Sequence, residues 1–238
     1  MANCELALQS HAGMTLAVVR RLVTVAIGIA AAYALSRQCR RPSGWLGRRL
    51  ARGMNIGHAR LTQWGLQHVR IEPDWRLLDI GCGGGQTVRT LAGLAAAGRV
   101  DGVDYSAASV DAARETNSDL IAAGRVAIHH GSVSRLPFDE GTFDLITAVE
   151  THYYWPDLAN DLREVRRVLK PEGRIVMIAE AYRGRSMDWL YRPVMRGLFR
   201  ANYLSLDEHR AVLTEAGFLD VEVDAEPSRG WMCVVGTH

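Results

Sequence analysis

The sequence has few cysteines, and none of them are spaced as in metal sites or disulfide frameworks. The four thiols lie far apart, at Cys4, Cys39, Cys82 and Cys233. Zinc sites and small disulfide-bonded domains need closely spaced cysteines. We therefore expect four free thiols, a reducing compartment and no metal. Internal repeats and low-complexity tracts are absent as well, which excludes a repeat architecture.

Acidic residues are nearly missing from the first 60 positions. Glu5 is the only one there, whereas the whole chain has a net charge of +2. The same stretch carries nine arginines: Arg20, Arg21, Arg37, Arg40, Arg41, Arg48, Arg49, Arg52 and Arg60. This asymmetry predicts a cationic N-terminal arm. The rest of the chain lacks a basic stripe with interleaved aromatics, so we expect no nucleic-acid partner.

The apolar run at 22–35 is too short to be assigned as a membrane span. It has fourteen residues, whereas crossing a bilayer takes about 20. Three interpretations stay open: a short anchor with flanking arginines, a secretory signal, and a helix docked on the body. We favour contact with a membrane surface through residues 16–53. More arginines follow the run than precede it, which would keep the body on the cytoplasmic side.

From residue 72 onward, short apolar runs alternate with longer segments of helical periodicity. This order is typical of a parallel sheet flanked by helices. The predicted strands cover 76–81, 99–104, 125–130, 142–149, 173–181, 218–226 and 231–236. The predicted helices cover 85–97, 106–122, 157–169 and 205–216. Only residues 227–230 join the last two strands, which predicts that this pair runs antiparallel.

Two further segments are expected to border a site on this domain of residues 72–238. After the N-terminal segment 1–41, residues 42–71 predict a cap of two short helices with a break near Gly53 and Gly57. Residues 182–204 form an insertion rich in aromatic, methionine and arginine residues. We interpret the insertion as an amphipathic lid for an apolar or aromatic ligand, or as a helix packed on the sheet edge.

A glycine turn follows the first predicted strand in the run Leu77–Gly85. Glycine lets a ligand approach the main chain, and the first amides of the next helix stay free to bind it. A dinucleotide-binding turn would have glycine at position 86, where this chain has Gln86. The turn therefore favours a sulfonium nucleoside over a pyrophosphate and disfavours a nicotinamide oxidoreductase.

The second predicted strand ends in Asp104, about 20 residues beyond the glycine turn. Nucleotide-binding α/β folds place there the acid that holds a ribose diol. Asp101 competes for the role but falls within the strand. Ser106 is expected to cap the next helix. Asp104 could instead be only a helix-start residue.

Four segments in this order resemble the class I S-adenosylmethionine-dependent methyltransferases, most closely the ubiquinone and menaquinone C-methyltransferase branch. They are Leu-Asp-Ile-Gly-Cys-Gly-Gly-Gly at 78–85, Val-Asp-Tyr-Ser at 103–106, Leu-Pro-Phe with Phe-Asp-Leu-Ile at 136–138 and 143–146, and Arg-Val-Leu-Lys-Pro-Glu-Gly at 167–173. The resemblance covers about residues 72–236. It implies a Rossmann-like α/β fold with a seven-stranded, mostly parallel sheet, and S-adenosyl-L-methionine as cofactor. A cytosolic cofactor disfavours export and places the protein in the cytoplasm or on the cytoplasmic face of the membrane.

The resemblance also assigns the cofactor-binding residues. Asp79, Gly81 and Gly83 would line the methionine part, Asp104 would hold the ribose, Tyr105 would flank the adenine, and Gly131, Ser132 and Val133 would meet the adenine edge. Gly85 is also expected to bind the cofactor. Many relatives have aspartate where Ser132 stands; the hydroxyl can still accept a hydrogen bond.

Candidate catalytic residues cluster in the segment 150–155. Methyl transfer needs a base only where the acceptor loses a proton. We expect His152 to be that base, Glu150 to orient it or contact the cofactor, and Tyr153 to border the acceptor. His129 and His130 are expected to be structural, and Met54, Asn55 and His58 to close over the cofactor. The alternative to a small-molecule methyltransferase is a membrane-tethered module that binds the cofactor without transfer.

Overall fold

The computed structural model describes residues 40–185 and 188–238, together with residues 24, 28, 30, 31, 33, 34 and 36–38. Side chains are left undescribed at 45, 46, 48, 50–52 and 54–56. The predicted apolar run 22–35 therefore falls mostly outside the described residues. Among the described residues, no helix has the length and apolar character needed to cross a membrane.

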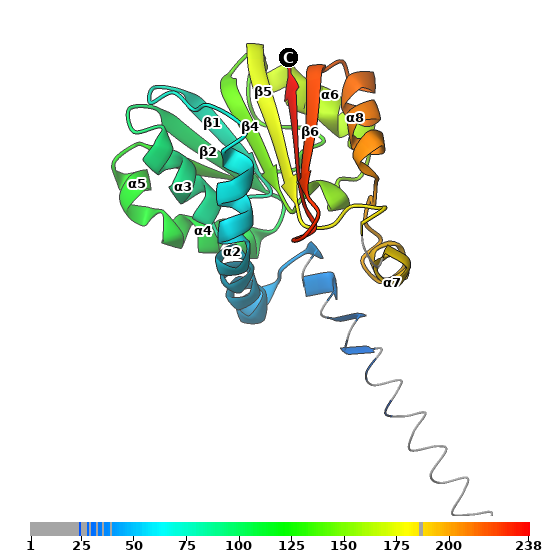
Figure 1. Ribbon diagram of the computed structural model, residues 1–238. Coiled ribbons are helices and arrows are strands. Elements are labelled where there is room, and N and C mark those ends of the chain that lie inside the picture. The colour runs from blue at the N-terminus through cyan, green and yellow to red at the C-terminus, as the bar shows by residue number, and fades with distance from the viewer. Residues whose placement is uncertain are drawn as a thin grey trace, which may run out of the picture.

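The core is a seven-stranded sheet in the order β3-β2-β1-β4-β5-β7-β6 (Figure 1). Its strands are β1 Arg76–Ile80, β2 Arg99–Asp104, β3 Val126–His130, β4 Phe143–Val149, β5 Leu169–Ala179, β6 Leu219–Glu226 and β7 Trp231–Thr237. Strand β7 is antiparallel to β5 and to β6, while β1 to β5 pair in parallel. The predicted α/β fold and the antiparallel end of the sheet are thus confirmed.

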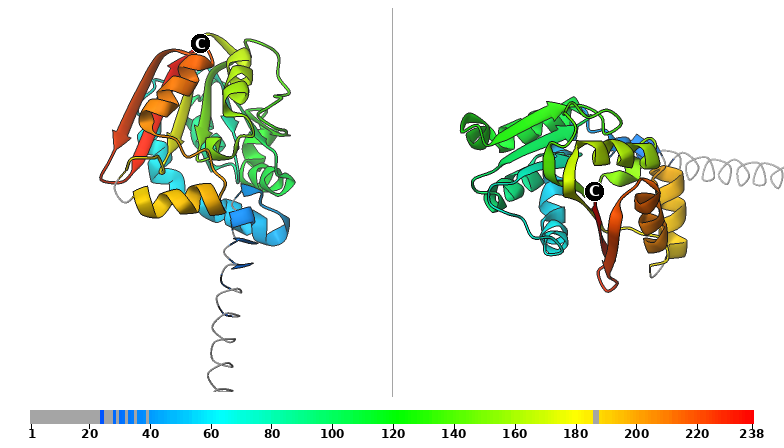
Figure 2. Two further views of the ribbon diagram at one scale, coloured as in Figure 1. Left: turned by 90° about the vertical axis from the view of Figure 1, so that its right-hand side faces the viewer. Right: turned by 90° about the horizontal axis from the view of Figure 1, so that it is seen from above.

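Helices cover both faces of the sheet (Figures 1 and 2). One face carries α2 Gly44–Leu66, α3 Gln86–Leu94, α4 Ala107–Thr116 and α5 Ser118–Ala122; the other carries α6 Leu158–Val168 and α8 Leu206–Glu215. Apolar side chains of β1, β4 and β5 alternate between the two resulting cores, as the two-residue repeat of a strand requires. Burial on both faces explains why these strands read as continuous apolar runs.

The predicted two-helix cap is wrong in one respect, because α2 is a single helix. It runs through Gly53 and Gly57, each of which costs only about 1 kcal/mol in a helix interior. Packing of its C-terminal half offsets that cost: Leu61 is buried, and a Cβ on Gly65 would lie 2.4 Å from the Ile178 side chain. The close approach at Gly65 fixes α2 against the end of β5.

The segment predicted as one helix over 106–122 forms two. Asn117 separates α4 from α5 and is fully buried. Its side-chain amide donates to the carbonyl oxygens of Gly85 (3.0 Å) and Ala113 (2.9 Å). A buried amide with such partners interrupts the helix because it competes for backbone hydrogen bonds, and it ties α4 to the turn before α3.

The insertion 182–204 contains α7 Asp188–Pro193 and a π-helical turn, Val194–Leu198. In Figures 1 and 2 these helices lie below the carboxyl ends of the parallel strands, on the side where the chain enters α2. The insertion is therefore beside the edge at which parallel α/β sheets bind ligands.

Candidate active site at the carboxyl ends of the strands

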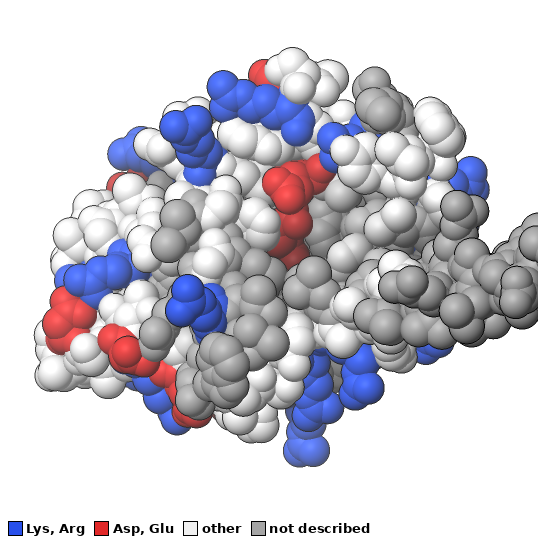
Figure 3. Space-filling view, turned by 90° about the horizontal axis from the view of Figure 1, so that it is seen from below, with Lys and Arg blue, Asp and Glu red and all other residues white. Residues whose placement is uncertain are grey.

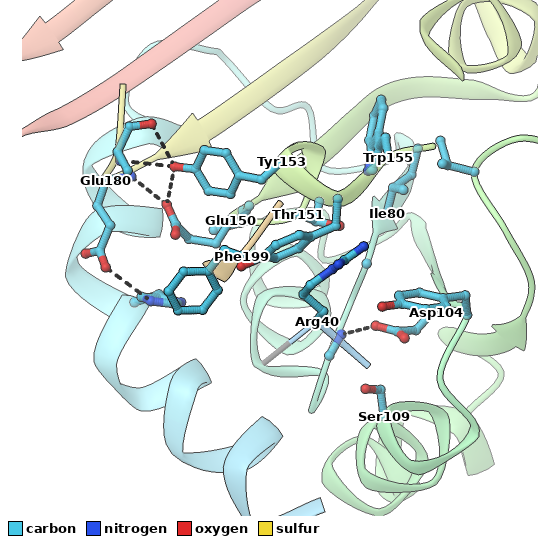
Figure 4. Close-up of a pocket in the computed structure, with 18 of the residues that line it drawn as sticks. Arg40, Ile80, Asp104, Ser109, Glu150, Thr151, Tyr153, Trp155, Glu180 and Phe199 are labelled. Carbon is cyan, nitrogen blue, oxygen red and sulfur yellow. Dashed lines mark hydrogen bonds and ion pairs between the residues drawn. The ribbon is translucent and has the colours of Figure 1, made fainter. Parts of the chain in front are cut away.

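A cavity of about 820 Å³ lies at this edge, within the range of small-molecule sites. Its walls come from the ends of β1, β2, β4 and β5, from α2, and from the insertion (Figure 4). Nine of the predicted site residues line it: Gly81, Gly83, Asp104, Tyr105, Gly131, Ser132, Val133, Glu150 and Tyr153. Three do not: Asp79, Gly85 and His152.

The glycine turn is held by main-chain hydrogen bonds to β2. The amides of Gly81 and Cys82 donate to the carbonyl oxygen of Val103 (2.8 and 3.1 Å). Gly81 and Gly83 have positive φ values, +70° and +53°. A Cβ on Gly81 would lie 2.1 Å from Oγ1 of Thr151, so glycine is required for both conformation and space.

Asp104 joins the turn to the start of α4. One carboxylate oxygen accepts from the amide of Gly83 (3.0 Å) and the other from the amide of Ser106 (2.8 Å). The Ser109 side chain is a further hydrogen-bond partner of this carboxylate. Because a carboxylate offers about four acceptor positions, acceptor capacity remains for a ribose hydroxyl. Burial raises the pKa of Asp104. Asp101, the competing acid, is buried elsewhere and pairs with Arg76 (3.2 Å) and His129 (2.8 Å).

Tyr105, Gly131, Ser132 and Val133 line the cavity beyond Asp104. Tyr105 is 40% exposed, and the Arg41 guanidinium lies over its ring, 5.8 Å from the centroid. The exposed part of the side chain offers an aromatic surface against which a planar base can pack. His130 keeps this corner in place, since its Nε2 lies 3.0 Å from the carbonyl oxygen of Tyr105. His129 and His130 thus hold structural contacts, as predicted.

Asp79 and Gly85 do not line the cavity, which differs from their prediction as cofactor-binding residues. Asp79 is 2% exposed and accepts from the hydroxyl of Thr147 (2.7 Å). Burial raises its pKa to about 7. Gly85, with φ +84°, packs its α-carbon against Asn117 and Ala113 at the start of α3. Both residues therefore make packing and hydrogen-bond contacts next to the glycine turn, outside the cavity lining.

Glu150 is the first residue after β4 and turns toward β5 (Figure 4). Its φ of +56° is unusual for a non-glycine residue, and such strain typically marks functional sites. One carboxylate oxygen accepts from the Glu180 amide and from the Tyr153 hydroxyl (3.3 Å). Burial, followed by the charge of Glu180, raises the pKa of Glu150 to about 7.

His58 and Glu180 complete a group of ionisable side chains around Glu150. Nε2 of His58 lies 3.7 Å from Oε1 of Glu180, and one ligand atom from each of the three residues falls within 4.8 Å of the others. The Glu180 carboxylate raises the pKa of His58, against the effect of burial. Of the three α2 residues predicted to close over the cofactor, His58 lines the cavity, and the side chains of Met54 and Asn55 are outside the described set.

His152 does not line the cavity, which differs from its prediction as the base beside the acceptor. It begins the 3-10 helix His152–Tyr154 and is fully buried. Its Nε2 lies 3.2 Å from Nε2 of His209 in α8. Burial lowers the pKa of His152 well below its usual range. The neighbouring Tyr153 turns toward the cavity instead.

Glu180, Arg40, Arg185 and Arg229 line the cavity but were absent from the sequence prediction. Glu180 could have been predicted, because it lies at the end of a predicted parallel strand, at the same edge of the sheet as Asp104. The three arginines could not have been predicted, since the sequence does not show which loops meet at the cavity.

The residues present fit an adenosine-type cofactor. The bent glycine turn exposes main chain, Asp104 keeps acceptor positions open, and the Tyr105 corner can take a base. The cavity continues past Glu150 and Tyr153, which leaves room for a second molecule.

Comparison with known proteins places this geometry in a family. A family model described as a methyltransferase domain matches residues 78–177. An uncharacterized methyltransferase of Synechocystis is 33% identical over 174 residues, covering 69% of this chain and 77% of the relative. A demethylmenaquinone methyltransferase of Lactiplantibacillus plantarum is 34% identical over 114 residues, covering 48% of each chain. The chain spans about half the length of several curated relatives that it matches.

A solved structure shares the fold. The S-adenosylmethionine-dependent methyltransferase from Aquifex aeolicus superposes with a TM-score of 0.64 at 19% identity, covering 80% of this chain and 97% of that one.

Proposed function

Because the chain belongs to the class I S-adenosylmethionine-dependent methyltransferases, whose cofactor is S-adenosyl-L-methionine, we propose that it methylates a small acceptor with an apolar or aromatic body. The observation that carries the proposal is a single cavity that joins the glycine turn and Asp104 to the aromatic wall of Tyr153, Tyr154 and Trp155. Tyr191, Met195 and Phe199 form the opposite wall. Such a lining suits an acceptor held mainly by apolar contact.

The cofactor supplies a methyl carbon activated by positively charged sulfur. The protein must align the acceptor and exclude water. Residues of the insertion line the cavity, and Arg40 lies between the Glu150 side and the Asp104 side of it (Figure 4).

Glu150 is the proposed proton acceptor in place of His152. One of its oxygens is held by the Glu180 amide and the Tyr153 hydroxyl, so the side chain has a fixed direction. With a pKa near 7 the carboxylate can take a proton from an acceptor O–H or N–H group at neutral pH. His58 and Glu180 set the charge around it and are positioning residues.

The test is transfer of a labelled methyl group from the cofactor to fractionated metabolites by the full-length chain. We expect label in an apolar or aromatic product. For Glu150→Gln we expect turnover on that product to fall at least about 100-fold, as for loss of a general base. The acidic limb of the rate profile near pH 7 should disappear, while cofactor affinity is retained. Gln keeps the hydrogen bonds of one oxygen and removes only the proton-accepting charge.

Glu140→Gln is the matched control, since Glu140 is exposed on the loop before β4. Unchanged turnover in Glu150→Gln would remove Glu150 from this role. Cofactor binding with no labelled product in any fraction would favour the cofactor-binding module. Loss of activity on treatment with a chelator, restored by a divalent cation, would instead make the three clustered side chains metal ligands.

A further inference from the structure

The α7 helix and the π-helical turn after it present two different faces. Tyr191, Met195 and Phe199 recur every four residues and line the cavity. A second set of side chains is exposed and follows a spacing of three and then four residues: Trp189, Arg192 and Arg196. The Trp189 side chain is 76% exposed, the highest value among the large exposed hydrophobic residues described. One short segment therefore closes the active site on its inner side and offers a tryptophan with two arginines to the outside.

The charge around this face is strongly one-sided. Within the described part of the insertion, Asp188 is the only acid, and it accepts from the hydroxyl of Tyr203 (2.7 Å). Arg185 and Arg229 line the cavity, and Arg41 and Arg200 are exposed. Seen from below, basic side chains surround a hollow that contains acidic ones (Figure 3). The rim is cationic, and the acids lie inside.

Exposed apolar side chains accompany these arginines. Leu190, next to Trp189 in the sequence, is 46% exposed. Val194 is 41% exposed as well, but it lines the cavity and so belongs to the inner side of the insertion. Tryptophan is enriched where proteins meet lipid headgroups, and arginine is attracted to anionic lipid. A protein partner with an acidic groove could match the charge, but the apolar residues here project from a convex helix beside a cavity that suits apolar molecules.

We propose that the outer face of the insertion, formed by Trp189, Leu190, Arg192 and Arg196, docks the protein on an anionic lipid surface with the cavity mouth facing the lipid. Trp189 and Leu190 enter the headgroup layer, and Arg192 and Arg196 contact the phosphates. The contact is peripheral and needs no membrane-spanning helix. Lipid binding can be measured without cofactor or acceptor, so this proposal can be tested independently of the proposed methyl transfer.

The experiment is sedimentation of the full-length chain with vesicles of phosphatidylcholine, with and without phosphatidylglycerol. We expect binding to the anionic vesicles that weakens as salt rises. An arginine near an anionic surface contributes about 1 kcal/mol, so Arg192→Gln with Arg196→Gln should weaken partitioning roughly 30-fold. The matched control is Arg163→Gln with Arg210→Gln, two half-exposed arginines on α6 and α8, away from this face.

Insertion of Trp189 is read separately by quenching with brominated lipids. The wild-type chain should lose more fluorescence than Trp189→Phe, with the difference confined to anionic vesicles. Cofactor affinity, which should stay unchanged in every variant, shows that the fold is intact.

Three results would overturn the proposal. The first is equal binding to neutral and anionic vesicles. The second is an arginine double variant that binds as well as its control, which would place any binding elsewhere in the chain. The third is self-association lost in the double variant without vesicle binding, which would make a second copy the occupant of this face.

Discussion

The two halves of the cavity are built in different ways. The half that we propose for the cofactor uses main chain and one carboxylate, from positions at or directly after the ends of three consecutive strands. The acceptor half uses side chains that converge from α2, β4, β5 and the insertion. The first half is local in the sequence, and the second exists only after the chain has folded. Because of this difference, we expect substitutions in one half to change cofactor binding and substitutions in the other to change acceptor chemistry. Glu150, which borders both halves, is the exception.

The largest effect is expected at Asp104, the side chain on which the cofactor half depends. Asp104→Ala should weaken S-adenosylmethionine binding at least roughly 100-fold, because it removes hydrogen bonds to a charged acceptor worth about 1.5–3 kcal/mol each. It also frees the Gly83 amide that shapes the turn. Calorimetric titration measures the loss.

Asp111→Ala is the control for Asp104→Ala, since Asp111 is exposed on α4. Unchanged affinity in Asp104→Ala would show that the ribose is held elsewhere, and the comparison between the two halves would fail. A loss of turnover without loss of affinity would move Asp104 into the acceptor half.

A smaller and more discriminating effect is expected from His58 and Glu180. The charge of Glu180 raises the pKa of Glu150, whereas that of His58 lowers it less strongly. Since the carboxylate is the active form, the rate should rise with pH through this pKa. His58→Gln should move the half-maximal pH upward and Glu180→Gln should move it downward. Each shift should be roughly 0.5–1 pH unit, below the usual range for close charges because Glu180 is half exposed.

The pH profile of turnover at saturating cofactor measures both shifts. Neither variant should reduce the high-pH plateau as much as Glu150→Gln does. Shifts in the same direction, or none, would mean that the two side chains only pack, and the acceptor half would then depend on Glu150 and Tyr153 alone.

The fold, and the grouping at one cavity of the residues proposed to bind the cofactor, could be predicted from the sequence because their signals are contiguous. Buried strands read as apolar runs, and the glycine turn and Asp104 follow strands directly. The pairing of ionisable groups could not be predicted, because it depends on the conformation at Glu150. Its positive φ and the 3-10 helix after it turn Tyr153 toward the cavity and His152 toward α8. Because the chain turns at Glu150, the predicted base His152 becomes a core residue and Tyr153 lies at the cavity instead.

The smallest effect on catalysis is expected at His152, which marks the border between the acceptor half and the core. Nδ1 of His209 lies 2.7 Å from the carbonyl oxygen of Ser205 and so carries the proton. Nε2 of His209 must then accept from Nε2 of His152, which leaves Nδ1 of His152 without a partner among the described residues. This arrangement requires His209 to be neutral, and a proton on Nδ1 of His152 would be a buried N–H group without a partner among the described residues. Burial accordingly lowers the pKa of His209 to about 4 and that of His152 well below its usual range.

Folded-state pKa values below the unfolded ones mean that the folded chain binds fewer protons. The two neutral histidines should therefore contribute their full share to the free energy of unfolding above about pH 6.5. This contribution should be lost as the pH drops toward 4. His152→Asn should make this fall shallower while leaving turnover within about twofold, since it removes no general base. Urea unfolding across this pH range and the methyl-transfer assay measure the two quantities. His238→Asn, at the chain end, should leave the acid slope unchanged. A large loss of turnover in His152→Asn with an unchanged slope would return His152 to the acceptor half.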